Sequence, residues 1–143
     1  MEVGSAASRA LRFGLEYSRV HISGRPCLDR WILYLGGTLR LHRFHRGDDA
    51  RAPHSHPWWF VTFPFTSYME VVHEDGRPVE VRMVKAWRFH YRPSNFQHIV
   101  MGRDRGTGPF WTIVLTGRAL QEWGFYPAPG KFVSYKNWPG ALE

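Results

Sequence analysis

The sequence predicts an all-β fold, a β-sandwich or small barrel, preceded by a short N-terminal helix. From residue 31 onwards, short runs rich in aromatic and β-branched residues alternate with glycine, proline and aspartate turns. Little of the chain after residue 20 has helical periodicity. Short strands at this spacing are typical of sandwiches and barrels. At 143 residues, the chain is expected to form one domain, residues 1–143, with its core over about residues 28–136.

The N-terminal helix is predicted over residues 6–17. Ser5 can cap its first turn, and Ala7, Leu11 and Leu15 follow at helical spacing.

Beyond the helix, the chain is predicted to alternate strands and turns. The predicted strands occupy residues 31–35, 38–46, 57–65, 67–73, 79–91, 98–101, 110–116, 121–126 and 132–135. Gly36-Gly37 separates the first two strands. Glu74-Asp75-Gly76 lies between two strand-like runs and predicts a tight hairpin.

Composition and charge narrow the class of partner. The formal net charge is +7, and of the 19 basic residues only Lys85, Lys131 and Lys136 are lysines. The arginines are scattered along the chain and form no single basic block, so no nucleic-acid partner is expected. Aromatic residues make up 16% of the chain, which argues against disorder.

The sequence also bears on the compartment. Cys27 is the only cysteine, so no internal disulfide can form and nothing indicates an oxidising environment. No stretch reaches the roughly 18 apolar residues that a membrane span needs, and the N-terminus lacks the apolar core of a signal peptide. A cytoplasmic protein without a membrane partner is therefore expected.

Three histidines carry the main functional prediction. His54 and His56 are separated by one residue next to a strand-like run, so a pleated strand would direct both imidazoles to the same side. His98 follows a turn about forty positions later and can approach them from a neighbouring strand. Three neutral imidazoles that converge form a good site for a first-row transition metal. The three are predicted to be metal ligands.

These motifs resemble those of the cupin superfamily. In its first motif two histidines are separated by one residue, as are His54 and His56 here, and its second motif is Pro-x-Gly-x-x-His. Pro93, Asn95 and His98 match the second motif, with asparagine in the glycine slot. Asparagine is the non-glycine residue that best accepts left-handed backbone angles. The resemblance covers roughly residues 38–126, and it implies a cupin-type double-stranded β-helix, or jelly-roll, barrel.

One departure from the cupin pattern changes the implied ligand set. Cupins usually supply a glutamate four or five residues after the second histidine, where this chain has Phe60 and Val61. Glu70 and Glu74 are too far along the chain to fill that slot unless the strands take a different path. The resemblance therefore implies a small single-domain cupin with a three-histidine site, as in thiol dioxygenases.

A three-histidine site implies a substrate class. Neutral ligands leave the full charge on a divalent metal, which favours an anionic substrate. The first interpretation is thus a metal-dependent dioxygenase, with Fe(II) favoured over Ni(II) or Zn(II). Its expected partners are dioxygen and a small acidic substrate derived from a thiol or amino acid. Thiol dioxygenases also carry a His-x-Tyr pair downstream of the third ligand. This chain has no such pair, so the groups around its metal are expected to differ from theirs.

Two alternatives remain open from sequence. A non-redox cupin, an isomerase or lyase, would use Zn(II) or Ni(II) as a Lewis acid and turn over without oxygen. A non-catalytic cupin would bind a small acid and release it unchanged. A homodimer is a further expectation, since cupins often pair through their sheets.

Other polar residues near the motifs are candidates for catalysis and substrate binding. The catalytic candidates are His45, Arg43 and Tyr91. Arg43 and Arg92 are the candidate carboxylate-binding groups, because a guanidinium offers a bidentate fork, and Arg40 and Arg30 lie further from the motifs in sequence.

Histidine and aromatic residues on the neighbouring strands are further candidates. His42 and His45 differ by three positions, so a regular strand sends them to opposite faces, and sequence does not say which one faces the metal. If His54 and His56 point inward, Trp58, Phe60 and Thr62 do so too. The candidate aromatic residues of the substrate site are Trp58, Phe60, Trp111 and Trp123.

Overall fold

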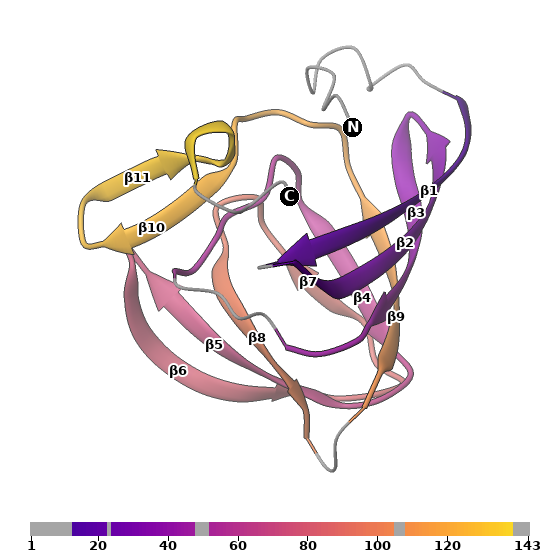
Figure 1. The fold of residues 1–143 in the computed structure, drawn as a ribbon, viewed down its shortest axis with the longest axis horizontal. Coiled ribbons are helices and arrows are strands. Elements are labelled where there is room, and N and C mark those ends of the chain that lie inside the picture. Colours follow the sequence, from indigo (N-terminus) through magenta and orange to yellow (C-terminus); the bar gives the residue numbers. More distant parts are fainter. Residues whose placement is uncertain (1–12, 23, 48–51, 105–107, 139–143) are drawn as a thin grey trace.

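The fold is almost entirely β. The structure is a computed structural model that describes residues 13–22, 24–47, 52–104 and 108–138, and Figure 1 shows its strands. Within these residues the strands form three sheets of six, three and two strands. No helix among the described residues is long and apolar enough to cross a membrane.

The six-stranded sheet forms one side of the molecule. Its strands lie in the order β1-β2-β3-β9-β4-β7, and all neighbours pair antiparallel. Their bounds are β1 Phe13–Ile22, β2 Arg25–Leu35, β3 Gly37–Phe44, β9 Phe110–Thr116, β4 Phe60–Pro64 and β7 His90–Arg92.

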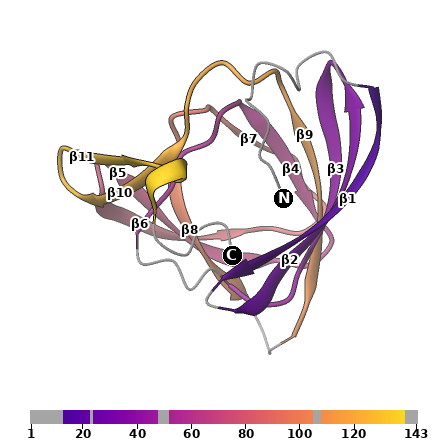
Figure 2. The same cartoon turned by 45° about the horizontal axis from the view of Figure 1, so that its top comes forward.

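The two smaller sheets form the other side. Strands β5 (Tyr68–Glu74), β6 (Arg77–Val84) and β8 (Gln97–Arg103) lie in the order β6-β5-β8. Strands β10 (Gly124–Ala128) and β11 (Lys131–Ser134) form a hairpin, followed by one 3-10 turn, η1 (Tyr135–Asn137). Figure 2 shows β5, β6, β8, β10 and β11 facing the six-stranded sheet across a common interior.

The sheets approach a barrel without closing into one. Among the described strands no continuous ladder joins the three sheets, although isolated bridges connect His54 with β8 and with β10. The sequence-based prediction of an all-β architecture is therefore confirmed, whereas hydrogen-bonded closure into a jelly-roll barrel is not seen in this part of the chain.

The prediction of a short N-terminal helix is wrong for residues 13–17, and residues 6–12 lie outside the described residues. Residues 13–22 form β1, which pairs with β2 from Phe13↔Leu35 to Ile22↔Arg25. Ser18 is buried while its neighbour Tyr17 is 51% exposed, as the two-residue period of a strand requires. Pairing along the whole of β2 satisfies the backbone and overrides the helical spacing of a few leucines.

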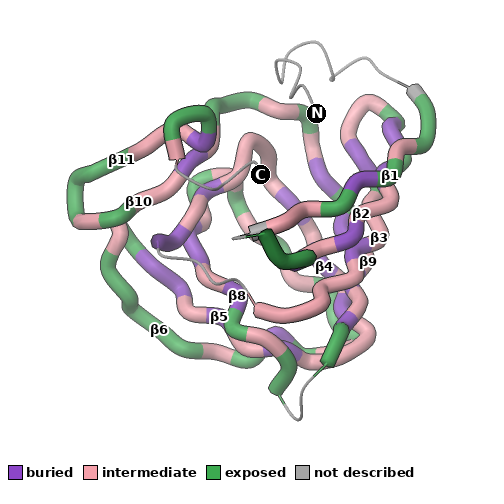
Figure 3. Tube along the Cα trace, in the orientation of Figure 1, coloured by how far each residue is buried: buried purple, intermediate pink, exposed green. Residues whose placement is uncertain are grey.

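One end of the interior is filled by aromatic packing. Phe110 is fully buried against Tyr68, Val84 and Val100. Its ring stacks on Phe44 with centroids 4.8 Å apart and on Tyr68 at 5.2 Å. Figure 3 shows how burial is distributed, with β6 exposed along most of its length. The packed core thus joins the six-stranded sheet to the β6-β5-β8 sheet.

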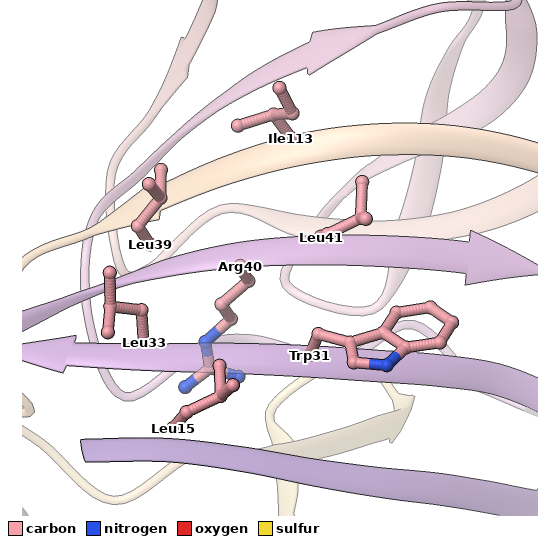
Figure 4. Close-up of a pocket in the computed structure, with 7 residues that line it drawn as sticks. All are labelled: Leu15, Trp31, Leu33, Leu39, Arg40, Leu41 and Ile113. Carbon is pink, nitrogen blue, oxygen red and sulfur yellow. The ribbon is translucent and has the colours of Figure 1, made fainter.

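The outer face of the six-stranded sheet is markedly apolar. A shallow groove of about 260 Å³ on this face, shown in Figure 4, is bordered by residues of β1, β2, β3 and β9. It is lined by Arg40 and by six apolar residues, Leu15, Trp31, Leu33, Leu39, Leu41 and Ile113. The six apolar side chains therefore point away from the interior that contains the histidines, whereas the Arg40 guanidinium lies over Trp58.

Candidate metal centre

The first two histidines lie in a short extended segment between β8 and β10. The amide of His54 donates to the carbonyl of His98 at 3.3 Å, and the amide of His98 donates back at 3.4 Å. On the other side, the amide of Ser55 donates to the carbonyl of Gly124 at 3.0 Å. The backbone of this segment is therefore fixed from both sides, so the side chains of His54 and His56 take the same direction.

The three predicted ligands come together. The rings of His54, His56 and His98 form a nearly equilateral triangle, with centroids 5.1, 4.9 and 5.0 Å apart. Each offers a ring nitrogen, and these nitrogens all lie within 4.8 Å of one another. Side chains from two segments about forty residues apart thus converge on one point. The cluster fits a three-histidine metal site.

The protonation state of the cluster suits a metal. Burial lowers the pKa of His54 to about 3, with a further contribution from the charge of His98. Burial, followed by the charges of His98 and His54, holds the pKa of His56 well below its ordinary value. Both imidazoles are therefore neutral near pH 7, the form that coordinates a cation.

One buried ring nitrogen supports the fit independently. Nδ1 of His56 is buried and has no hydrogen-bond partner within the described residues. Buried polar atoms in proteins are nearly always partnered, because an unmet one costs about 1–3 kcal/mol. A ligand at the centre of the cluster would offset that cost, so the donor set and its surroundings both fit a bound cation.

A buried carboxylate orients the third histidine. Nδ1 of His98 lies 2.8 Å from Oε2 of Glu70, whose side chain is 1% exposed. Because the carboxylate only accepts, Nδ1 carries the proton and Nε2 keeps its lone pair for a metal. Arg82 donates to Oε1 of Glu70 at 2.9 Å, and Arg92 donates to the same oxygen at 3.0 Å. The carboxylate is therefore held by three donors.

These donors keep Glu70 ionised. Burial alone would raise the pKa of its carboxyl group, but the hydrogen bond and charge of His98, with Arg82 and Arg92, bring the pKa to about 2. A negative charge behind a ligating histidine raises the electron density on its other nitrogen. Glu70 thus contributes to the site without belonging to the ligand group itself.

Sequence reasoning considered Glu70 only as a metal ligand and missed this supporting role. The available signal was its pairing: Glu70 faces Arg82 across the β5–β6 hairpin, which the turn at Asp75-Gly76 predicts. Glu70 also alternates with Tyr68 and Val72, and all three are buried. An acidic residue at the inward positions of a strand indicates a buried partner.

Aromatic rings surround the histidines, as the parity argument predicts. The Phe60 ring lies 4.5 Å from that of His56, and the Trp58 ring lies 5.6 Å from it. Trp123 approaches His54 at 6.4 Å. Two further rings, Phe96 and Phe125, also pack on the cluster and were not singled out from sequence. The surroundings of the site are therefore largely apolar.

The three catalytic candidates lie elsewhere. Arg43 and His45 follow the outer parity of β3, and Nε2 of His45 lies 2.8 Å from a carboxylate oxygen of Asp29. Tyr91 pairs with Val61 and is 61% exposed. The structure does not bring these side chains to the histidines, and their catalytic roles stay predictions that this geometry does not support.

Two substrate-binding candidates are engaged in other contacts. The Arg43 guanidinium lies 5.6 Å from the ring centroid of Trp111, which itself stacks on Trp31 of the outer face at 5.7 Å. Arg92 contacts Glu70 and stacks over Phe96 at 4.9 Å. Trp111 is thus remote from the cluster, whereas Arg92 lies near it but is committed to the carboxylate.

The inner parity of β3 carries different residues. Thr38, Arg40 and His42 alternate with the outward-facing Leu39 and Leu41. Of His42 and His45, it is therefore His42 whose side chain faces the interior. The guanidinium carbon of Arg40 lies 4.7 Å from the Trp58 ring centroid. Its charge contributes to the lowered pKa of His56. Arg40 is therefore a cation close to the metal centre.

Comparisons with known proteins agree with this architecture. A cupin 2 conserved barrel domain protein from Rhodopseudomonas palustris has a TM-score of 0.57 and 11% identity over 78% of this chain and 77% of its own. A crystal structure of Fe(II) HppE has a TM-score of 0.58 and 9% identity over 71% of this chain. A chain from the crystal structures of the DMSP lyases RdDddP and RnDddQII has a TM-score of 0.55 and 14% identity over 78% of this chain. The likeness shows a cupin-type fold.

The limits of the likeness are equally plain. This chain spans 56% of the length of the HppE chain and 62% of that of the DMSP lyase. No protein-family model matches the sequence, and no curated protein matches it at the sequence level. Fold and site together define a protein with a cupin-type fold and three clustered histidines.

Proposed function

We infer that this protein is a metal-dependent oxygenase that uses a three-histidine Fe(II) or Ni(II) centre on a small anionic substrate derived from a thiol or an amino acid. The observation that carries this proposal is the convergence of His54, His56 and His98, with Glu70 behind His98. That arrangement provides three imidazole nitrogens and, among the described residues, no carboxylate ligand, which leaves the charge of a divalent ion available to an anion.

The chain's own residues define the chemistry that the site can support. A bound divalent ion with three protein ligands would supply open positions for substrate and dioxygen. Glu70 fixes the tautomer of His98, and the rings of Phe60 and Trp58 limit the access of water to the cluster. Arg40 supplies a positive charge on the side of the cluster where an acidic substrate would lie.

Iron is the preferred metal in this proposal. A structurally similar chain is an Fe(II) protein, HppE, although its identity of 9% carries no residue correspondence. Nickel fits the same ligand type, because imidazole binds both metals. Zinc is the third possibility, and it would restrict the site to Lewis-acid chemistry.

A non-redox lyase is the second candidate, favoured by the structural likeness to DMSP lyases. It needs no oxygen, so turnover under anaerobic conditions separates it from the oxygenase. A non-catalytic binding protein, the third candidate, would release its ligand unchanged.

Oxygen consumption tests the proposal. Protein reconstituted with Fe(II) is mixed with cysteine, other small thiols and amino acids in an oxygen-electrode cell. We expect uptake that depends on one of these substrates, is lost in His56→Ala and persists in His90→Ala, whose ring hydrogen-bonds the Lys85 carbonyl away from the cluster. Anaerobic turnover would favour the lyase. Metal-loaded protein that binds a panel member but neither consumes oxygen nor alters the ligand would refute enzymatic function.

A further inference from the structure

Besides Nδ1 of His56, two further unpartnered polar atoms lie deep on the inner face of the six-stranded sheet. Nε2 of His42 and Oγ1 of Thr112 are both buried without a hydrogen-bond partner among the described residues. The two residues are only 8% and 1% exposed and are paired directly across β3 and β9. Neither belongs to the metal cluster. Two adjacent buried groups with unmet hydrogen bonds indicate a binding position.

The charge around this pair is positive. Arg40 lies two residues from His42 on the same face of β3, and Arg30 faces His42 across the β2–β3 ladder. Burial, followed by the charges of Arg40 and Arg30, holds the pKa of His42 well below its ordinary value. Its imidazole is therefore neutral, and Nε2 can donate when the proton sits on that nitrogen. The local field disfavours a cation and favours an anion.

The available donors also select the type of ligand. The Thr112 hydroxyl and the neutral imidazole of His42 can each donate one hydrogen bond, and the Arg40 guanidinium adds charge. An ionised oxyanion accepts only, so it can accept from both His42 and Thr112, with the positive charge of Arg40 nearby. A neutral apolar ligand would leave His42 and Thr112 unsatisfied.

This position is within reach of the metal centre. The Arg40 guanidinium lies over the ring of Trp58 at 4.7 Å, and its Nε donates to Oγ1 of Thr38 at 2.8 Å. The Trp58 ring lies 5.6 Å from the ring of His56. From Arg40 to His42 the strand advances by about 7 Å, at roughly 3.4 Å per residue. A small molecule can therefore extend from the histidine cluster past Arg40 to His42 and Thr112.

We propose that His42 and Thr112, next to the positive charge of Arg40, form an oxyanion subsite for the far end of a bifunctional substrate whose other end lies at the metal centre. The inference rests on the proposed function and narrows its substrate class. The substrate carries one metal-binding group, such as a thiolate, and a second acidic group, a carboxylate, sulfonate or phosphonate, on a short linker. A simple thiol or a simple acid lacks one of the two attachments.

The test compares ligands that differ only in the far group. Wild-type protein loaded with Co(II) is titrated anaerobically with 3-mercaptopropionate, 3-mercaptopropanesulfonate, 3-mercaptopropylphosphonate and uncharged 1-propanethiol, with thiolate-to-cobalt absorption as the readout. We expect at least one acidic thiol to bind about tenfold or more tightly than propanethiol, as a charged hydrogen-bonded group implies. The acid that binds best identifies the oxyanion.

Two variants connect the selectivity to the residues. Thr112→Val removes the hydroxyl at nearly constant volume, and His42→Phe removes the ring nitrogens. Both are expected to reduce the preference for the acidic thiol about tenfold while propanethiol affinity and cobalt content stay unchanged. Thermal stability should be equal or higher in Thr112→Val, because the hydroxyl has no partner to lose. Thr66→Val, in the turn before β5, is the matched control and should retain the preference.

Two results would overturn the subsite: equal affinity of the wild type for all four thiols, or an unchanged preference for the acidic thiol in both variants. The proposed function fails separately: selective binding of an acidic thiol without oxygen uptake by the Fe(II) protein leaves the subsite standing and refutes the oxygenase.

If the protein holds no cobalt, isothermal titration of propionate, propanesulfonate and propylphosphonate tests the subsite alone. Binding that is lost in His42→Phe supports it, and no binding overturns it.

Discussion

Glu70 is the residue on which the orientation of the metal centre depends. Its carboxylate contacts His98 at 2.8 Å and also accepts from Arg82 and Arg92. A residue of the β5–β6 hairpin thereby controls a ligand on β8. The contact between Glu70 and His98 involves a residue outside the two cupin-like motifs. The pairing of β5 with β6 and β8 brings Glu70, Arg82 and His98 together.

Glu70→Gln is expected to weaken metal binding about 10–100-fold, the usual effect of losing a carboxylate behind a ligating histidine. Glutamine keeps the volume but not the charge, so Nδ1 of His98 loses its ionised acceptor. The measurement is a competition titration with a chromophoric chelator for Zn(II) or Co(II).

Glu74→Gln is the control for this variant. Glu74 lies on the same strand but is exposed. The metal affinity of the Glu74→Gln variant should therefore match that of the wild type. Equal affinities in the Glu70→Gln and Glu74→Gln variants would show that the carboxylate does not act on the metal centre.

At the scale of the elements, strand parity decides which residues reach the site. On β3, Arg40 and His42 face the interior while Arg43 faces outward, as does His45 just beyond the strand. Sequence correctly predicts that the two histidines lie on opposite faces, because the period of a strand is two. It cannot choose the inner face, because both faces of β3 carry apolar and polar residues.

The predictable part of the fold follows from local signals. Residues 110–116 form β9 with the predicted bounds, and the predicted hairpin turn joins β5 to β6. The predicted strand at 79–91 is instead two strands, β6 and β7, which belong to different sheets. The helix at 6–17 fails over its described part because pairing with β2 is a long-range interaction. His54, His56 and His98 were predictable from motif spacing, whereas Glu70 and Thr112 required the register of paired strands.

The β5–β6 turn offers a test at this scale. Gly76 has a φ of 75°, and a Cβ there would lie 3.0 Å from the backbone of Ala128. Gly76→Ala is therefore expected to destabilise the fold by about 2 kcal/mol or more, from left-handed strain together with displacement of β10. Urea denaturation followed by fluorescence measures the change.

Gly130→Ala separates the two causes. Gly130 has a similar φ of 70°, but nothing lies within 4 Å of its Cβ position. This variant should lose only the conformational part, about 1 kcal/mol. If the two variants lose the same free energy of unfolding, close packing of the β5–β6 turn against β10 does not contribute to stability.

At the scale of the whole molecule, one buried carboxylate makes the outer sheet sensitive to acid. Asp29 is 2% exposed and accepts hydrogen bonds from Arg19 at 2.6 and 3.1 Å and from Tyr17 at 3.0 Å. The Arg19 hydrogen bond, opposed by burial and supplemented by His45 and Tyr17, holds the pKa of Asp29 well below its ordinary value of 3.8.

The sign of the pH dependence follows from this lowered pKa. The unfolded chain takes up the proton at a higher pH than the folded protein does, so the stabilisation is complete above about pH 5 and is lost as the pH falls through about 4 and below. Asp29→Asn should therefore be less stable than the wild type at pH 7, and its free energy of unfolding should fall less between pH 5 and pH 3. Denaturant titrations at several pH values measure this difference. A pH dependence in Asp29→Asn equal to that of the wild type would exclude this role.

The central claim concerns the three clustered histidines, and metal analysis of the purified chain tests it most directly. Elemental analysis after reconstitution and desalting should find about one first-row transition metal per wild-type chain, as expected for a three-imidazole site. The same procedure should find almost none in His98→Ala and a full complement in His90→Ala. A wild-type protein that retains no metal, or a His98→Ala variant that retains as much as the wild type, would contradict the account.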